Sequence, residues 1–312
     1  MSGTNNHTIH AHHHHAGWDN SLEPVLEVSP GETLTFETLD ASGGQLSASS
    51  STADVRTLDF SRINPVTGPV RVLGAEPGDA LAVKLIEFRP SGWGWTANIP
   101  GFGLLAEDFP EAHLKTWTFG EGKTATFADG IVVPLKAFPG TIGVAPAESG
   151  PHSVVPPRAC GGNLDIRDLA AGTTLYLPVQ VAGALFSVGD THAAQGDGEV
   201  CGTAIESPMA VTVEFDLVKG ADLRAPQFET PSPVTRHLDS KGYYVTTGVG
   251  PELMTAAKEA VAAMIEHLGK TYGLAPEDAY LLCSVACDLR ISEIVDLPNW
   301  VVSFYLPLQI FS

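Results

Sequence analysis

Short runs of β-branched and other apolar residues, separated by turn residues, follow one another along most of the chain. In the first third these runs cover residues 24–28, 34–39 and 80–88, with Pro-Gly pairs at 30–31 and 77–78. Further runs lie at 124–127, 131–135, 174–179, 184–188 and 210–217. Short apolar segments bounded by Gly and Pro predict β-strands. Their close spacing favours a sandwich or a barrel over a wound α/β sheet.

Helical periodicity is confined to the C-terminal part of the chain. Apolar residues recur at three- and four-residue steps from 254 to 268, between Pro251 and Gly273, which predicts a helix there. A second helix is predicted at 277–288 and a last strand at 300–306. Two segments without either periodicity, 43–54 and 92–102, are predicted to be loops.

These elements predict a mainly β protein. We expect a β-sandwich or jelly-roll-like body over residues 1–220 that carries the functional site. A smaller α+β portion over residues 221–312 would contain the C-terminal helices and pack on this body. A single integrated domain is the alternative.

Composition narrows the class of partner. The chain has 312 residues, of which 44% are hydrophobic, enough for a sizeable core. With 36 acidic and 17 basic residues its formal net charge is −19, which repels nucleic acid and anionic membranes. We therefore expect neither partner. The first 16 residues are polar and His-rich, unlike a secretory signal, and no segment has the length and apolarity of a membrane span.

The cysteines point to a reducing compartment. The chain has four of them and no Cys-x-x-Cys pair, which is no disulfide framework in a chain of this length. We expect reduced, buried thiols in a cytoplasmic protein. They are Cys160, Cys201, Cys283 and Cys287.

The densest group of reactive residues lies at 189–206, directly after a predicted strand. In an extended chain Asp190 and His192 point to the same side, because one residue separates them. Such a pair can offer a carboxylate oxygen and an imidazole nitrogen to one Zn²⁺. Asp165, in the glycine-bounded segment 161–165, is the candidate third ligand. Three protein ligands leave a coordination position for water, as in catalytic zinc sites.

Each of these residues also has a structural interpretation. Asp190 is compatible with capping a turn beside a surface histidine, and Asp165 with a surface charge cluster. Glu199 and Glu206 are expected to be solvated by default. Other catalytic designs have less support, because the chain lacks a Gly-x-Ser-x-Gly elbow, a Gly-x-Gly-x-x-Gly loop, a Walker loop and a His-Glu-x-x-His motif.

Several motifs together resemble the acetamidase/formamidase family. They are Ile142-Gly-Val-Ala-Pro146, Gly161-Gly-Asn-Leu-Asp165, Leu177-Pro-Val179, Gly183-Ala-Leu-Phe186 and Gly189-Asp-Thr-His-Ala-Ala-Gln-Gly-Asp-Gly-Glu199. The resemblance extends from Trp18-Asp19 to Val295-Asp296 and so covers nearly the whole chain. It implies hydrolysis of a small amide to a carboxylate and ammonia, on a β-rich fold with an α+β portion. It also implies a homo-oligomer, a dimer or a tetramer.

The resemblance assigns roles to particular residues. It implies a divalent metal ion, zinc by preference, held by Asp165, Asp190 and His192. Residues expected to bind substrate are His15, Trp95, Gly161, Gly162 and Asn163. His15 matches a histidine that precedes the early tryptophan of the family, although the tract His12-His-His14 departs from the pattern.

Amide hydrolysis also requires a proton carrier. A metal ion can activate water and polarise the carbonyl group, and a nearby carboxylate can transfer the proton. We expect Glu148 to be this carboxylate, because it lies shortly before the Gly161 motif, with Glu199 as the reserve. A lactam or cyclic imide hydrolase of the same family is the nearest alternative. A non-enzymatic β-sandwich module that binds small ligands on Trp93 and Trp95 is the second.

Overall fold

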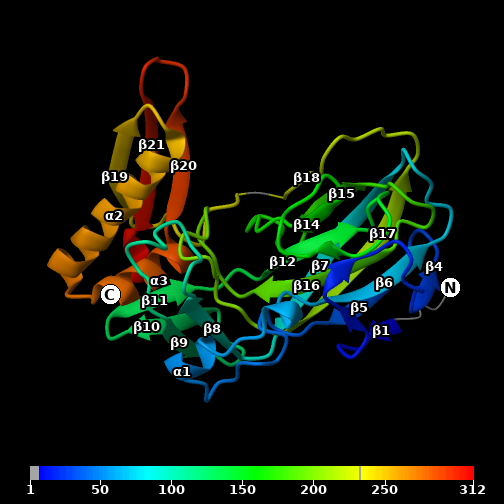
Figure 1. The fold of residues 1–312 in the computed structure, drawn as a ribbon, viewed down its shortest axis with the longest axis horizontal. Helices are drawn as coiled ribbons and strands as arrows, with labels where there is room; N and C mark the ends of the chain where they lie inside the picture. The colour runs from blue at the N-terminus through cyan, green and yellow to red at the C-terminus, as the bar shows by residue number, and fades with distance from the viewer. Residues whose placement is uncertain (1–6, 232) are drawn as a thin grey trace.

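The computed structural model describes residues 7–231 and 233–312, and two large sheets make up most of it (Figure 1). The first sheet has the order β1-β5-β17-β7-β15-β18. Its strands are His7–Ile9, Thr33–Glu37, Met209–Val218, Ala80–Pro90, Thr174–Pro178 and Gln227–Glu229. The second has the order β14-β12-β16-β6-β2, with β4 also paired to β6. Its strands are Gly161–Asn163, Phe138–Val144, Phe186–His192, Val66–Val72, His14–His15 and Leu26–Val28.

The two sheets pack through aromatic side chains. Phe186 of the second sheet contacts Phe36 and Phe215 of the first, with ring centroids 5.5 and 5.0 Å apart. All three side chains are fully buried. Burial of this much apolar surface between two sheets is the main stabilising contribution in a sandwich. The prediction of a mainly β fold is confirmed.

Three two-stranded sheets adjoin the sandwich. They pair β8 (Trp93–Asn98) with β9 (His113–Thr118), β10 (Thr124–Ala128) with β11 (Ile131–Pro134), and β3 (Gly17–Trp18) with β13 (His152–Ser153). The prediction that 92–102 is a loop was wrong, because β8 occupies most of it. Gly94 is needed in this strand, since a Cβ there would lie 2.6 Å from the carbonyl oxygen of Glu206. The other predicted loop, 43–54, ends in the short helix α1 (Thr52–Val55) and is followed by the 3₁₀ helix η1 (Phe60–Arg62).

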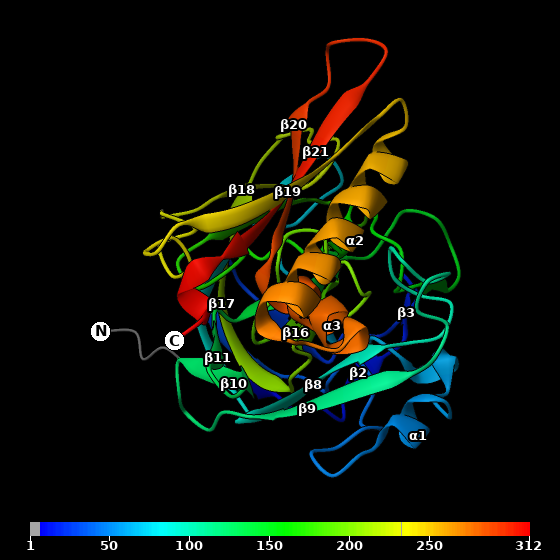
Figure 2. The same cartoon turned by 90° about the vertical axis from the view of Figure 1, so that its left-hand side faces the viewer.

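The C-terminal elements form a sheet of their own. The order β19-β21-β20 joins Tyr243–Gly250, Trp300–Pro307 and Asp288–Glu293, and η2 (Leu308–Ile310) follows. Helix α2 (Leu253–Tyr272) lies across this sheet (Figure 2), and it ends at Gly273 in the left-handed conformation, as glycine caps do. Helix α3 (Pro276–Ala286) ends before Asp288, which was predicted to be helical and instead begins β20.

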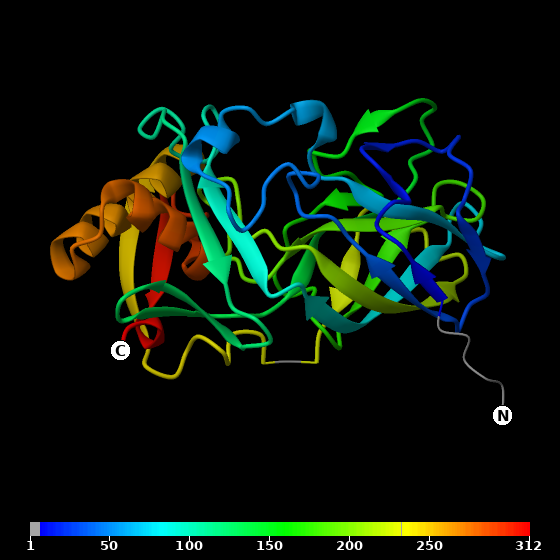
Figure 3. The ribbon, with the colours of Figure 1, turned by 90° about the horizontal axis from the view of Figure 1, so that it is seen from below.

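Hairpin β8–β9 lies between the sandwich and the C-terminal sheet (Figure 3), whereas hairpin β10–β11 lies beside the end of the chain, where Ile131 forms a β-bridge with Phe311. The division at residue 220 stays a prediction, and β18, which lies beyond it, pairs with β15 of the sandwich. Within the described ranges, none of the helices combines the length and the apolar character that crossing a membrane requires.

Candidate active site

Strand β16 brings Asp190 and His192 into the interior. It pairs with β12 on one side and β6 on the other, and its residues are buried along its whole length. Asp190 has a φ of +48°, an uncommon conformation for a non-glycine residue that favours a functional explanation. Its Oδ2 atom accepts hydrogen bonds from Asn64 Nδ2 and Thr141 Oγ1, each at 3.0 Å. The carboxylate is therefore fixed from one side.

Glu206 joins this pair from the segment that follows. Isolated β-bridges connect it to His192 of β16 and to Trp95 of β8. Its Oε1 atom accepts the Ala204 N–H at 2.8 Å, whereas Oε2 lies 3.2 Å from His192 Nε2 and has no hydrogen-bond partner. The expectation that Glu206 is solvated was wrong, because the residue is only 3% exposed.

Asp165 and Glu199 complete the acidic group, both with positive φ. Asp165 follows β14, and its N–H donates to the carbonyl oxygen of Gly140 at 3.2 Å. Its Oδ1 atom is buried without a hydrogen-bond partner. Glu199 Oε1 lies 4.0 Å from His192 Nε2. Both carboxyl groups therefore face the imidazole that Asp190 and Glu206 also approach.

The segment 196–203, here called the Glu199 loop, is held by the C-terminal elements. Gly196 N–H donates to the Ser284 carbonyl oxygen at 2.8 Å, and Cys201 N–H donates to Ser284 Oγ at 3.2 Å. Leu289 N–H donates to the Asp197 carbonyl oxygen at 2.8 Å. Helix α3 and strand β20 thus position Glu199 without contributing a side chain to the cavity described below.

The His192 ring is oriented by Gln195. Its Nδ1 atom lies 2.9 Å from Gln195 Oε1, and Gln195 Nε2 donates to the carbonyl oxygen of Asp165 at 2.8 Å. The amide therefore presents its oxygen to Nδ1, which carries a proton, and Nε2 faces the carboxylates. Burial lowers the pKa of His192, but the Glu206 and Asp190 carboxylates outweigh it and raise the pKa well above its usual value.

Four carboxyl groups around one imidazole form a strongly acidic site. Burial raises the pKa of Asp165 to about 7 and raises the pKa of Glu199 and of Glu206 as well. No lysine or arginine of the described chain lines the cavity beside them. Buried negative charge is costly unless protons or a cation compensate it. Two sets of potential ligand atoms each lie within 4.8 Å of one another and share His192. They are Asp165, His192 and Glu199, and Asp190, His192 and Glu206.

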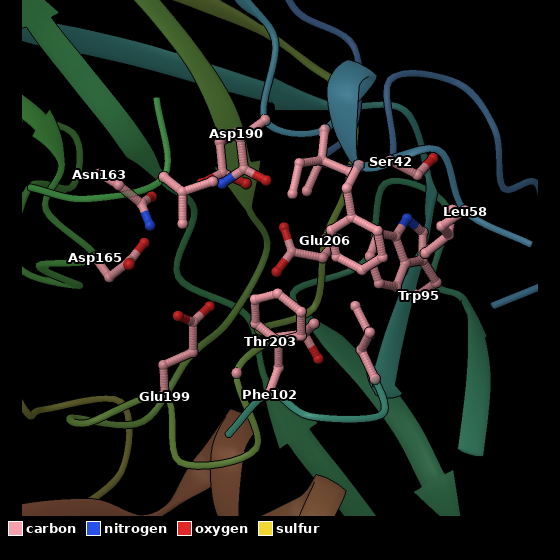
Figure 4. A pocket seen from close by; sticks show the side chains of 17 residues that line it. Ser42, Leu58, Trp95, Phe102, Asn163, Asp165, Asp190, Glu199, Thr203 and Glu206 are labelled. Atoms are coloured by element: carbon pink, nitrogen blue, oxygen red, sulfur yellow. The ribbon is translucent and has the colours of Figure 1, made fainter. Parts of the chain in front are cut away.

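These residues meet at a cavity of about 90 Å³ (Figure 4). Asp165, Asp190, Glu199 and Glu206 line one side of it, and His192 lies just behind them. Trp95 forms part of the wall, with its Nε1 donating to Asp40 Oδ1 at 2.9 Å. The Asn163 amide also faces the cavity and lies 2.8 Å from Thr141 Oγ1. A single water needs about 10–15 Å³ on this scale, so a small organic molecule fits.

The structure thus brings together six of the residues singled out from the sequence. They are Asp165, Asp190, His192, Glu199, Trp95 and Asn163. Gly161 and Gly162 lie in β14 against β12 and do not line the cavity. Their φ values of +104° and +102° show that the backbone there requires glycine.

Two other predicted residues lie elsewhere. The Glu148 side chain is exposed and is not part of the cavity lining. His15 is held by the Gly17 carbonyl oxygen at 2.7 Å and by Ser187 Oγ at 2.9 Å, also outside the cavity. The reason is local: His15 lies in β2, which pairs with β6 and meets β16 at Ser187 near its start, and Glu148 lies in the connection between β12 and β13.

The chain resembles known proteins over nearly its whole length. The sequence profile of the Acetamidase/Formamidase family matches residues 3–154 and 147–312. The chain belongs to this family. The resemblance inferred from the motifs is therefore confirmed, and the chain is an amidase, a hydrolase of amides.

Individual proteins also align over most of the chain. The formamidase of Methylophilus methylotrophus is 29% identical over 367 residues, covering 95% of this chain and 89% of that protein. The gamma lactamase from Delftia acidovorans has a TM-score of 0.91 at 29% identity and covers 98% of this chain and 93% of its own. The acetamidase from Bacillus halodurans has a TM-score of 0.69 at 32% identity and covers 97% of both chains.

Proposed function

We propose that this amidase hydrolyses a small amide to a carboxylate and ammonia with a divalent metal ion held by Asp190, His192 and Glu206. The observation that carries the proposal is how these three side chains are held. Asn64 and Thr141 fix one oxygen of Asp190, the Ala204 N–H fixes one oxygen of Glu206, and Gln195 fixes Nδ1 of His192. In each residue the remaining atom faces the other two. Such outer contacts orient metal ligands.

The residues fit a cation rather than an apolar or anionic group. Glu206 Oε2 and Asp165 Oδ1 are both buried and lack hydrogen-bond partners, a costly arrangement that a cation would relieve. One imidazole nitrogen with carboxylate oxygens suits Zn²⁺, the metal that we propose. When bound, such an ion supplies a Lewis acid that polarises the amide carbonyl and lowers the pKa of water. Asp165, in the second set around His192, remains a candidate ligand.

The other groups of the cavity bind substrate and move protons. The Asn163 side chain offers both a donor and an acceptor, which complement the carbonyl oxygen and the NH₂ group of an amide. Glu199 takes the proton-transfer role that the sequence had favoured for Glu148, because it faces His192 across the cavity. It accepts a proton from the attacking water and returns it to the departing nitrogen. Trp95 covers the site from one side and limits access of further water.

Metal analysis combined with an ammonia-release assay tests the proposal. We expect about one divalent ion per chain, loss of activity on chelation and recovery on addition of zinc. Glu206→Gln should lose both metal and rate, whereas the control Glu214→Gln, on β17 outside the cavity, should keep both. Full activity in exhaustively chelated protein would refute the metal-dependent mechanism.

A second set of variants separates the ligand from the proton carrier. Glu199→Gln should keep the metal ion and the fold while losing about 10²–10⁴-fold in kcat, the usual contribution of one acid or base. Glu148→Gln should turn over at nearly the wild-type rate. If the two variants exchanged these results, the proton-transfer role would return to Glu148.

Lactam opening is the second candidate function, and one observation favours it. The gamma lactamase superimposes with a TM-score of 0.91, against 0.69 for the acetamidase, at similar identity and coverage. A lactam has the same scissile C–N bond, but its nitrogen stays attached to the product, so no ammonia is released. Assays of both substrate classes distinguish the two activities. Lactam opening yields an amino acid without ammonia, whereas hydrolysis of a linear amide releases ammonia.

A further inference from the structure

The cavity has two chemically different sides. Away from most of the carboxyl groups the lining is mainly apolar, although Ser42 also lies there, and the proposed hydrolysis does not use the apolar side chains. They are Leu58, Phe60, Ile63, Ile99, Phe102 and Val155. Apolar walls in a small-molecule site bind the carbon skeleton of the ligand, while the few polar groups orient its reactive end. Formamide has no carbon atom beyond its carbonyl and would leave these walls exposed to water.

Two aromatic side chains stand at the outer edge of the apolar side. Phe60 and Phe102 are 46% and 41% exposed, unlike the buried residues at the base of the cavity. Their rings are stacked, with centroids 5.2 Å apart and planes inclined by 7°. Large apolar side chains exposed beside a cavity are typical of a ligand-binding surface. The pair therefore forms the mouth through which a substrate reaches the carboxyl groups.

The segments that carry Phe60 and Phe102 are each held beside the cavity by their own hydrogen bonds. Next to Phe60, Asp59 N–H donates to Gln45 Oε1 at 2.8 Å, and Gln45 Nε2 donates to the carbonyl oxygen of Ser42, a lining residue, at 2.7 Å. On the other side, Phe102 N–H donates to the Ile99 carbonyl oxygen at 3.0 Å. The hydrogen bonds of these two segments thus set the spacing of the rings.

The segment after Phe102 lies directly against the Glu199 loop. Leu104 N–H donates to the Val200 carbonyl oxygen at 2.8 Å. Gly103 has a φ of +90°, and a Cβ there would lie 2.7 Å from the Cys201 carbonyl oxygen. The Phe102 wall and the proposed proton carrier are therefore held at a fixed separation, which limits the length of the acyl group between them.

The volume of the cavity also limits the size of that group. The cavity of about 90 Å³ is several times larger than the roughly 10–15 Å³ that a single water requires. It therefore has room for a short acyl group beside the reacting carbonyl and nitrogen, but not for a long chain.

We propose that Phe60 and Phe102 determine specificity, selecting amides whose apolar acyl group is longer than acetyl and short enough to fit between Phe102 and Glu199, linear or closed into a lactam ring. This proposal rests on the proposed function and adds the substrate class. Covering one methylene in an apolar pocket changes kcat/KM by about 10-fold or more. The preference should therefore rise steeply from formamide to the amide that fills the cavity.

The test compares kcat/KM for formamide, acetamide, butyramide, hexanamide and 2-pyrrolidinone. We expect butyramide or 2-pyrrolidinone to exceed acetamide by about 10-fold or more, with formamide and hexanamide lower. Phe60→Ala and Phe102→Ala should each lose about 10-fold on the favoured substrate, mainly through KM, with little change on acetamide and unchanged metal content. Phe60→Leu should recover most of the loss. Phe228→Ala, an exposed residue of β18 outside the cavity, is the control.

The outcomes separate this proposal from the proposed function. A wild-type enzyme that hydrolyses formamide best, with Phe60→Ala and Phe102→Ala unchanged, would overturn the proposal and leave the amidase mechanism standing. Equal losses on every substrate would also overturn it, because they would indicate a structural role. Comparing the linear amides with 2-pyrrolidinone shows whether linear amides or lactams fill the apolar side of the cavity.

Discussion

Replacing Gly140 with alanine should damage the active site without straining the backbone. Gly140 lies in β12, behind the acidic group, and its φ is not positive, so alanine can adopt its conformation. A Cβ at this position would lie 2.6 Å from His192 Cε1, 2.7 Å from His192 Nε2 and 2.8 Å from Asp165 Oδ1. Ordinary van der Waals contact begins at 3.4 Å. The new methyl group must therefore push His192 and Asp165 forward.

The size of the displacement sets the expected loss. The three contacts fall short of 3.4 Å by about 0.6–0.8 Å, and close packing leaves little room to absorb such a shift. A misplacement of about 1 Å in an active site can cost about 100-fold in rate. We expect Gly140→Ala to lose about 10- to 100-fold in kcat/KM and part of its metal ion. Overpacking should also lower the free energy of unfolding by about 1–3 kcal/mol.

Amide hydrolysis, metal content and urea unfolding should be measured on the same preparations. Gly269→Ala is the matched control, because Gly269 lies in α2 and its added Cβ would come no closer than 3.4 Å to a neighbour. That variant should keep full activity and gain about 1 kcal/mol in stability from helix propensity. Wild-type kcat/KM and metal occupancy in Gly140→Ala would refute the placement of His192 and Asp165 described above.

Three further predictions concern groups outside the proposed metal set. Burial raises the pKa of the Cys201 thiol to about 11, so it is not a nucleophile at neutral pH, and Cys201→Ser should keep most of its kcat. Arg167→Met should lower the free energy of unfolding by about 3–5 kcal/mol, measured in urea, because the fully buried Asp288 carboxylate loses its bidentate partner. Burial, Lys136 and Arg167 lower the pKa of His237 to about 4. The unfolded chain binds this proton near pH 6.5 and the folded chain does not, so stability should fall from pH 6.5 towards 4, and less in His237→Asn.

The sequence predicts strands well where apolar runs are bounded by turn residues. The run at 210–217 became β17 and that at 80–88 became β7, and most apolar residues of each run are buried in the core. Prediction failed where tertiary pairing decides the structure. Strand β8 begins with Trp93, Gly94 and Trp95, and only its pairing with β9 and its bridge to Glu206 make it extended. No local pattern records these partners.

The same distinction applies to the site. The spacing of Asp190 and His192 indicated that they act together, and both do approach one point, although the positive φ of Asp190 is not that of a regular strand. Glu206 was missed because its position depends on bridges to two different strands. The available signal was chemical: a lone acidic residue follows the apolar pair Ala204 and Ile205, where an unpaired charge would be costly.

The attachment of the Glu199 loop to α3 and β20 has a consequence for how the amidase is made. The strands of the sandwich up to β17 precede α3 in the chain and are synthesised first, since proteins are made from the N-terminus at about 5–20 residues per second. Ser284 and Leu289, which hold the loop, are added later. A growing or prematurely terminated chain can therefore form sheet structure while its acidic cavity is incomplete. We therefore expect hydrolytic activity only after α3 and β20 have been added, so a fragment that ends before α3 should be inactive.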